Sequence, residues 1–251
     1  MIPNLIHKVL STMAGHQVQA LLMGGQACVL YGAAEFSRDV DFAILPEPSN
    51  LERFKSAMKD LDAHRIAVPP LGVECLLRGH AVHFRCQHPD AKDIRVDIMA
   101  RLRLMTDFAG LWERRTTLTS ADGTAYELLS PDDLVQAKKT QRDKDWMMLK
   151  RLVEVYYFQN RGSREPDRIR FWLKELRTPE LLLEAAAAEP GLSRELAGGR
   201  PLLSCALAKN DTGLERLLAQ EEQTEREKDR LYWLPLKAEL EEMRHQRFRR
   251  L

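Results

Sequence analysis

Over about the first 110 residues, short apolar runs alternate with turn-forming residues. The runs 19–23, 40–45 and 94–99 are the clearest, and two of them end at Gly24-Gly25 and at Pro46. Such runs, bounded by turn residues, are typical of β-strands. The longer run 51–61 is amphipathic and indicates a helix between two strands. This part of the chain therefore has an α/β or α+β pattern.

Segment 71–85 has apolar residues on both sides of Arg78-Gly79. Glycine after a polar residue is a common turn signal. We expect a β-hairpin there.

After Tyr126 the pattern becomes helical. Ser130 is suited to cap a helix, Pro131 suits the first helical position, and Asp133 lies where a capping box has an acid. The sequence predicts a helix from there through Lys138. A second helix is expected over 146–158.

From Pro166 onward the spacing of apolar residues predicts helices almost throughout. One apolar face is formed by Ile169, Trp172, Leu173 and Leu176. Further helices are expected over 181–188, 213–220 and 236–247, separated by Pro190, Gly198-Gly199 and Pro235. Segment 160–166 is the best linker candidate. We therefore expect an α+β fold with a mixed sheet flanked by helices in residues 1–160, followed by an all-helical domain in 161–251.

The composition is that of a folded protein: 251 residues, 44% hydrophobic and 30% charged. A formal net charge of +1 excludes a whole-protein field that would attract nucleic acid, so any such contact must be local. No apolar run approaches the roughly 20 residues that cross a bilayer, and the first residues lack the features of a signal peptide. We expect a cytoplasmic protein with no membrane partner.

Cysteine and histidine offer little chemistry. The four cysteines (Cys28, Cys75, Cys86 and Cys205) have no zinc-binding spacing, and we expect each to be a buried, reduced thiol. Three histidines (His80, His83 and His88) cluster in sequence but also lack ligand spacing. We expect them at the surface or at a sheet edge.

Acidic residues carry the first chemical signal. Asp39 and Asp41 alternate with Val40 and Phe42, so in a strand both carboxylates share one face while the apolar side chains enter the core. They would lie roughly 7 Å apart along the strand. Neighbouring carboxylates repel each other unless a cation neutralises them. A hard divalent ion is the natural partner.

A third acid, Asp97, occupies the polar face of the run 94–99, whose Ile94, Val96 and Ile98 form the apolar face. If this strand pairs beside 40–45, Asp97 completes a three-carboxylate cluster. Such a cluster can hold two Mg²⁺ ions roughly 3.5 to 4 Å apart, which clamp a triphosphate and activate a hydroxyl. Asp93, at the edge of the strand, is the rival third acid.

The turn Gly24-Gly25 follows a strand and precedes an expected short helix over 26–31. Glycine permits close backbone approach, and free amides at a helix start bind anions, so a triphosphate would fit there. Ser37 and Arg38, just before the acidic strand, are placed to contact the phosphates as well.

These residues resemble the DNA-polymerase-beta-like nucleotidyltransferase superfamily. Its signature is a hydrophobic residue, Gly, Gly or Ser, a gap, Asp-hydrophobic-Asp/Glu-hydrophobic, and an acid on a later strand. Met23-Gly24-Gly25, then Asp39-Val40-Asp41-Phe42, then Asp97 follow this order. Gly-Gly-x-Ala with Ser-Arg-Asp-Val-Asp is similar to the minimal nucleotidyltransferases that include abortive-infection-type toxins. Asp133-Leu134, Lys138 and Arg142-Asp143-Lys144-Asp145 repeat that group's downstream arrangement.

The resemblance covers about residues 15–150 and implies a nucleotidyltransferase-type fold and roles for individual residues. Asp39, Asp41 and Asp97 would bind two Mg²⁺ ions, with Asp97 a ligand of the catalytic metal or the acceptor of the hydroxyl proton. Gly24, Gly25, Ser37 and Arg38 would hold the nucleotide phosphates. Lys138 would be a point charge on the triphosphate or the leaving pyrophosphate, with Asp145 as a late acid near it.

The activity implied is transfer of a nucleoside monophosphate from an NTP, such as ATP, to a hydroxyl, with release of pyrophosphate. The acceptor would be an RNA end, a protein side chain or a small molecule, and the narrower resemblance adds a toxin of a toxin–antitoxin pair. An antitoxin or another helical protein is then the expected partner.

Three alternatives stay open. The first is an inactive nucleotidyltransferase-like module that binds a protein partner through 161–251. The second is an unrelated α+β domain whose carboxylates never meet. The third concerns the basic residues between 138 and 151, which would form either a patch for RNA or the nucleotide, or a solvated helix face with Lys138 as a surface lysine.

Overall fold

The computed structural model describes residues 4–120, 122–162 and 165–248. They form two compact units. Unit 1 comprises the described residues of Met1–Leu30, Ala34–Ala137 and Tyr232–Leu251. Unit 2 comprises those of Tyr31–Ala33 and Lys138–Leu231. The domain boundary at residue 160 stays a prediction.

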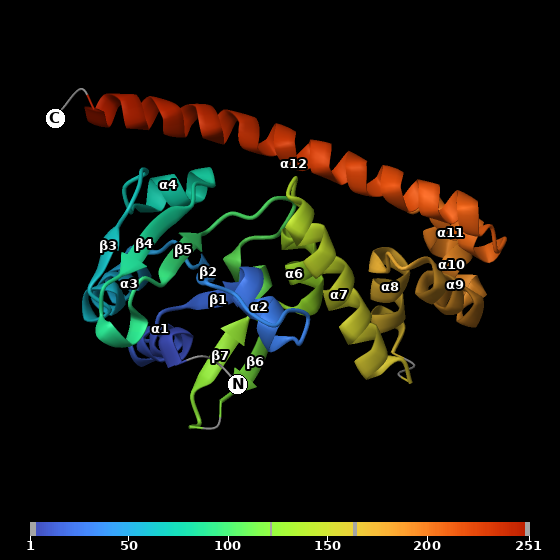
Figure 1. Ribbon diagram of the computed structural model, residues 1–251, viewed down its shortest axis with the longest axis horizontal. Coiled ribbons are helices and arrows are strands. Elements are labelled where there is room, and N and C mark those ends of the chain that lie inside the picture. The colour runs from blue at the N-terminus through green and yellow to red at the C-terminus, as the bar shows by residue number, and fades with distance from the viewer. Residues whose placement is uncertain (1–3, 121, 163–164, 249–251) are drawn as a thin grey trace. The chain divides into compact units, whose positions relative to one another are not determined.

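Unit 1 is built around a seven-stranded mixed sheet in the order β3-β4-β5-β2-β1-β7-β6 (Figure 1). The strands are β1 (Ala20–Met23), β2 (Asp39–Ile44), β3 (Ala63–Arg65), β4 (Val82–Cys86), β5 (Arg95–Met99), β6 (Thr116–Thr119) and β7 (Ala125–Leu128). The pairs β2–β5 and β1–β7 are parallel, and the other pairs are antiparallel. The expected α+β class with a mixed sheet is confirmed.

The helices of unit 1 are short. They are α1 (Asn4–Gly15), α2 (Gly24–Leu30), α3 (Pro48–Asp60), α4 (Val73–Arg78), α5 (Phe108–Glu113) and α6 (Pro131–Ala137), with a 3₁₀ turn η1 (Pro89–Ala91). In α6 the expected cap is present, because the Asp133 backbone N–H donates to Ser130 Oγ over 3.2 Å. The Ser130 hydroxyl in turn donates to the Asp133 carboxylate over 2.9 Å.

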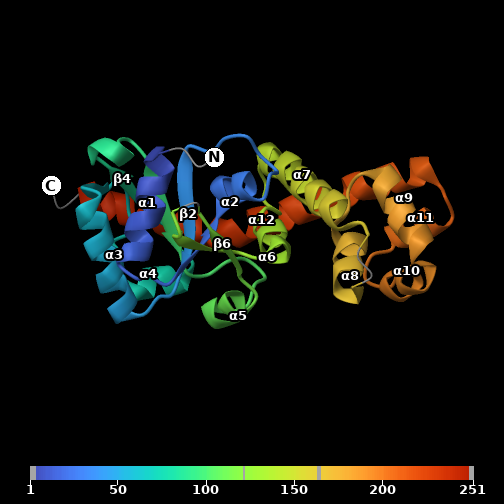
Figure 2. The same cartoon turned by 90° about the horizontal axis from the view of Figure 1, so that it is seen from below.

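One face of the sheet is apolar and enters the core. Val40 and Phe42 of β2 are buried, as are Val96 and Ile98 of the neighbouring β5. Helix α3 covers this face: the Phe54 ring meets the Phe84 ring of β4 edge-on, with centroids 5.3 Å apart. Helix α1 lies beside α3 (Figure 2). The period-two alternation that predicted the strands therefore also fixes which face remains for polar side chains.

The hairpin expected over 71–85 is wrong. Residues Val73–Arg78 form α4, and only Val82–Cys86 is a strand, paired with β3 and β5. Gly79 has φ +105° and ends α4 in the left-handed conformation. A glycine that ends a helix and a glycine in a hairpin turn give the same sequence signal, and the burial of Leu76 decides for the helix.

Unit 2 is helical, as expected for most of the C-terminal region. Its helices are α7 (Asp143–Asn160), α8 (Pro166–Glu175), α9 (Pro179–Ala188), α10 (Pro190–Leu196), α11 (Leu202–Leu207) and the first part of α12 (Asp211–Phe248). The linker expected at 160–166 lies between α7 and α8, and residues 163–164 fall outside the described part of the chain.

A break at Pro235 was expected, but Pro235 lies inside α12. An interior proline costs a helix about 3 kcal/mol. Contacts of unit 1 offset this cost around the proline. Leu236 is 4% exposed and lies against the Gly79 turn, and Glu239 accepts hydrogen bonds from Arg78 Nε over 2.9 and 3.0 Å.

Two further expectations can be compared with the structure. All four cysteines are free thiols, but only Cys28 and Cys86 are buried; Cys75 and Cys205 are partly exposed. Burial raises the pKa of Cys86 to about 11. No helix in the described ranges combines the length and the hydropathy needed to span a bilayer.

Candidate functional site

The polar face of the sheet in unit 1 brings the three predicted acids together. Strand β5 pairs with β2 in parallel, with Asp97 opposite Asp41 and Arg95 opposite Asp39. Residues in register point to the same face, and neighbouring strands lie about 4.8 Å apart. Asp39, Asp41 and Asp97 therefore share one surface of two adjacent strands.

The register extends this arrangement into two rows across the sheet. The first row runs His83, Asp97, Asp41 and Met23, from β4 through β5 and β2 to β1. The second row runs Arg85, Arg95 and Asp39. Each carboxylate is thus framed by residues that lie far away in sequence.

Asp97 is the most buried of the three acids, at 8% exposure. Arg95 Nε donates to its Oδ1 over 2.7 Å and Arg95 Nη2 to its Oδ2 over 2.6 Å. His83 Nδ1 lies 2.8 Å from the same Oδ1. Asp97 is therefore held by two side chains that the sequence argument did not include in the site.

Burial would raise the pKa of Asp97, but hydrogen bonds from His83 and Arg95, together with their charges, outweigh it and lower that pKa. The hydrogen bond to Asp97 raises the pKa of Arg95, and the charges of Asp97, Asp39 and Asp41 add to this effect. Asp97 is consequently a carboxylate at neutral pH, and Arg95 lies within the field of all three acids.

The histidine expectations need correction. His83 is part of the acid cluster, and His80 is only 1% exposed, so neither is a plain surface residue. His88 caps the η1 turn by accepting from the Asp90 backbone N–H over 3.1 Å. Sequence could not assign His83, because its place beside Asp97 depends on the pairing of β4 with β5. Arg95 had a weak signal, two residues before Asp97 on the same strand face.

The glycine turn expected after β1 is the first turn of helix α2, and it lies directly against the acids. Gly24 has φ +70°, and a Cβ there would lie 1.9 Å from Asp41 Oδ2. A Cβ on Gly25 would lie 2.6 Å from Ser37 Oγ. Gly24 therefore excludes a side chain both for steric reasons and for its backbone conformation, whereas a side chain at Gly25 would require Ser37 to shift. The turn brings unsubstituted backbone to Asp41 and Ser37.

The remaining predicted residues of this region flank the cluster. Ser37 Oγ donates to the Asp39 carbonyl over 3.1 Å, and Arg38 is exposed. The rival acid Asp93 lies outside β5, is exposed, and has φ +63°, which interrupts the strand alternation. Asp97, not Asp93, is the acid that the register places beside Asp41.

Lys138, in the loop between α6 and α7, and Asp145, in the first turn of α7, belong to unit 2 and form a second cluster. Lys138 Nζ lies 2.9 Å from Asp145 Oδ1, and the two residues are 6% and 1% exposed. Thr140 Oγ1 and Arg142 Nε each donate to Asp145 Oδ2 over 2.7 Å. Burial would raise the pKa of Asp145, but the charge of Lys138 and the other partners lower it. Lys138 is therefore a buried lysine and not the surface residue of the simplest interpretation.

Helix α12 also holds this loop from within unit 2. Asp229 accepts from the Gln141 backbone N–H over 3.0 Å, and Arg226 Nη1 donates to the Gln141 carbonyl over 3.3 Å. Lys139 pairs with Glu175 of α8 over 2.7 Å. Several residues of the basic run thus form internal ion pairs, while Lys144, Lys150 and Arg151 are exposed.

The acid cluster suits a hard divalent ion in its donor chemistry, because carboxylate oxygens are the ligands that Mg²⁺ prefers. Asp41 itself occupies the place that a Gly24 side chain would take, so the Asp41 carboxylate packs directly against the Gly24 backbone. Within the described residues, however, no three His, Cys, Asp or Glu side chains form a ready metal-binding group. Both oxygens of Asp97 already accept hydrogen bonds from Arg95.

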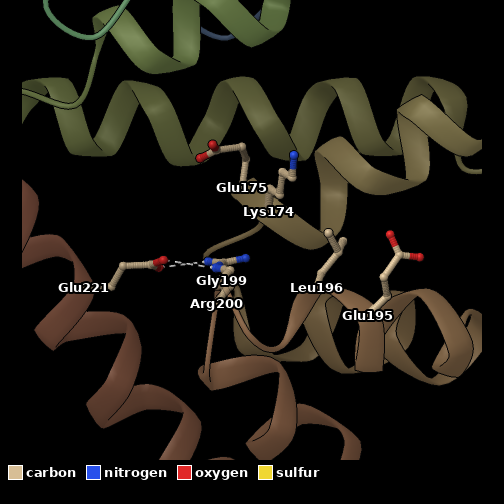
Figure 3. Close-up of a pocket in the computed structure, with 7 residues that line it drawn as sticks. All are labelled: Lys174, Glu175, Glu195, Leu196, Gly199, Arg200 and Glu221. Atoms are coloured by element: carbon tan, nitrogen blue, oxygen red, sulfur yellow. Dashed lines mark hydrogen bonds and ion pairs between the residues drawn. The ribbon is translucent and has the colours of Figure 1, made fainter.

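A cavity of about 310 Å³ lies in unit 2 between α8, α10 and α12 (Figure 3). Arg200 faces Glu221 across it, with Nε–Oε1 and Nη2–Oε2 distances of 3.1 and 3.0 Å. Glu195 pairs with Arg170, which does not line the cavity, and Glu175 with Lys139. Because these charges are paired, the cavity points to no ligand.

Comparison with models of protein families and with curated proteins finds no match. The geometry of the acid cluster therefore carries the functional argument.

Proposed function

We propose that this protein is a Mg²⁺-dependent nucleotidyltransferase with a fold of the DNA-polymerase-beta-like type. It would transfer a nucleoside monophosphate from an NTP to a hydroxyl and release pyrophosphate. The observation that carries the proposal is the register of β2 with β5, which sets Asp97 beside Asp41, with the Gly24 turn against that same carboxylate.

In this proposal Asp39, Asp41 and Asp97 hold Mg²⁺. The metal would supply charge neutralisation for the triphosphate and a lowered pKa for the attacking hydroxyl. Asp97 acts in this proposal as a ligand of the metal, and acceptance of the hydroxyl proton is the other role that the resemblance implies.

The phosphates would lie over the Gly24-Gly25 turn. A backbone without side chains permits close approach there, and Ser37 borders the same place. The resemblance adds Arg38, which is exposed. Lys138 and Asp145 enter the proposal as a pair. Within unit 2, Asp145 lies 2.9 Å from the Lys138 ammonium and would orient it; the role of Lys138 on the triphosphate or the leaving pyrophosphate stays what the resemblance implies. Catalysis would then consist mainly of positioning and charge stabilisation.

The test is incubation of the purified full-length protein with each α-³²P-labelled NTP and Mg²⁺. RNA, protein and small hydroxyl compounds serve as acceptors, and pyrophosphate release is followed in parallel. We expect label transfer by the wild-type protein and a loss of at least about 100-fold in Asp41→Asn, because the metal provides most of the transition-state stabilisation. Asp90→Asn is the matched control, since that carboxylate is 75% exposed and lies outside the cluster.

A protein that neither binds nor consumes any NTP, with Asp41→Asn behaving identically, would refute the proposal. It would favour the second candidate, an inactive module that binds a helical protein partner or antitoxin through its C-terminal region. One observation supports that alternative: Arg95 and His83 already satisfy Asp97 without a metal. A toxin role remains part of the first proposal, and growth arrest that needs Asp41 would support it.

A further inference from the structure

The Arg95 guanidinium lies inside the proposed metal site. It makes a two-pronged contact with Asp97, at 2.7 and 2.6 Å, and its register partner on β2 is Asp39. Its side chain is 36% exposed, whereas the Asp97 side chain is only 12% exposed. A partly exposed cation therefore covers a buried carboxylate.

A metal ion and Arg95 compete for the same oxygens. A carboxylate offers about four lone-pair positions on its two oxygens. Asp97 Oδ1 already faces both Arg95 Nε and His83 Nδ1, and Oδ2 faces Arg95 Nη2. A divalent ion at Asp97 would also repel the guanidinium at close range. Three of the four positions are thus taken, and charge repulsion opposes a metal ion on Asp97 for as long as Arg95 stays there.

The charges around the site indicate where Arg95 goes. The three aspartates carry −3, which Arg95 reduces to −2 in the absence of a metal, with His83 taken as neutral. Divalent ions on the cluster reverse that sign, and an incoming triphosphate then provides the nearest new anion. The planar guanidinium fork matches two phosphate oxygens as well as it matches a carboxylate. Asp39 lies opposite Arg95, and its backbone carbonyl accepts a hydrogen bond from Ser37 Oγ, which borders the proposed phosphate position.

We infer that Arg95 is a tethered cation that occupies the metal position on Asp97 in the metal-free protein and moves to the substrate triphosphate when metal binds. The inference rests on the proposed function. Metal would bind weakly without nucleotide, and nucleotide would strengthen it by drawing Arg95 away. Because such coupling is reciprocal, metal would strengthen nucleotide binding by the same factor.

The test is a titration of the nucleotide-free, full-length protein with Mn²⁺, with the free ion followed by electron paramagnetic resonance. We expect Arg95→Gln to bind Mn²⁺ about tenfold more tightly than the wild type, and to bind NTP in the presence of Mn²⁺ about tenfold more weakly. Arg85→Gln is the control. Arg85 lies next to Arg95 in the same row, and its Nη1 donates to the Asp93 carbonyl over 3.3 Å, so the control removes a nearby charge without touching Asp97.

Arg95→Lys provides a second variant that keeps the charge but lacks the fork, and thermal unfolding checks that each variant folds. We expect Arg95→Lys to bind Mn²⁺ with intermediate affinity. Equal shifts for Arg95→Gln and Arg85→Gln, or weaker Mn²⁺ binding by Arg95→Gln or Arg95→Lys, would overturn the inference while leaving the proposed function standing. Failure of the proposed function would give a different result. Neither the wild type nor Arg95→Gln would then show Mn²⁺ binding that depends on Asp41, and both the proposed function and this inference would be refuted.

Discussion

Two buried aspartates, Asp97 on the sheet of unit 1 and Asp145 in the helical unit 2, have similar immediate surroundings. Each accepts hydrogen bonds from two basic side chains, and each has a pKa lowered by its partners in spite of burial. The partners of Asp145 (Lys138, Thr140 and Arg142) all lie within seven residues of it. Those of Asp97 come from its own strand and from β4.

The difference lies in what surrounds each cluster. Asp97 has Asp41 beside it and Asp39 in the next row, so acids outnumber the permanent cations. Asp145 pairs with Lys138 and Arg142, while Asp229 binds the Gln141 backbone of the same loop and Asp143 pairs with Arg226. The sheet cluster is therefore suited to take up a further cation, whereas the charges around Asp145 already pair with one another. Burial and a lowered pKa alone would not have distinguished them.

The largest effect on stability is expected at Asp145. Asp145→Asn leaves the buried Lys138 without a counter-charge, which typically costs about 3 to 5 kcal/mol. Asp97→Asn should cost no more than about 2 kcal/mol, because Arg95 and His83 are partly exposed and can reach water. Urea unfolding of the two variants measures both values. Equal costs would remove the structural distinction between the clusters.

A smaller effect is expected at the Gly24 turn. Gly24→Ala combines a left-handed backbone with a Cβ against Asp41, and should cost about 2 kcal/mol. In the proposed function it should also reduce nucleotide transfer at least about tenfold, because Asp41 must shift. Gly15→Ala is the control, since a Cβ there meets nothing within 4 Å. Full transfer activity in Gly24→Ala would show that the Gly24 turn is not part of the nucleotide site.

The smallest effect concerns Glu239, an ion-paired carboxylate outside both clusters. Its hydrogen bond from Arg78, with a contribution from His80, lowers its pKa to about 2. Stability from this pair is therefore complete above the unfolded pKa of about 4.3 and is lost as the pH falls toward about 2. The difference in unfolding free energy between wild type and Glu239→Gln should therefore be smaller at pH 2 than at pH 6. An equal difference at both pH values would show that the contribution does not arise from charge.

Much of the sheet could be predicted from the sequence, because the alternation of Val40 and Phe42 with Asp39 and Asp41 shows both that the segment is a strand and which of its faces is polar. The position of Asp97 beside Asp41 could not be predicted, because it depends on which strands pair. His83 could not be found, since nothing local to it reveals Asp97 as its neighbour. Pro235 was misread because tertiary contacts around Leu236 and Glu239, absent from local sequence, outweigh the cost of an interior proline.

The central claim is that Asp39, Asp41 and Asp97 together bind the metal ions that hold the nucleotide triphosphate. Crystals of the full-length protein grown with Mn²⁺ and a non-hydrolysable NTP analogue test it most directly through the anomalous signal of manganese. The account predicts a manganese peak at a coordination distance of about 2.2 Å from oxygens of Asp41 and Asp97, with Arg95 on the phosphates. No manganese at these carboxylates under saturating conditions, with Arg95 still bound to Asp97, would contradict it.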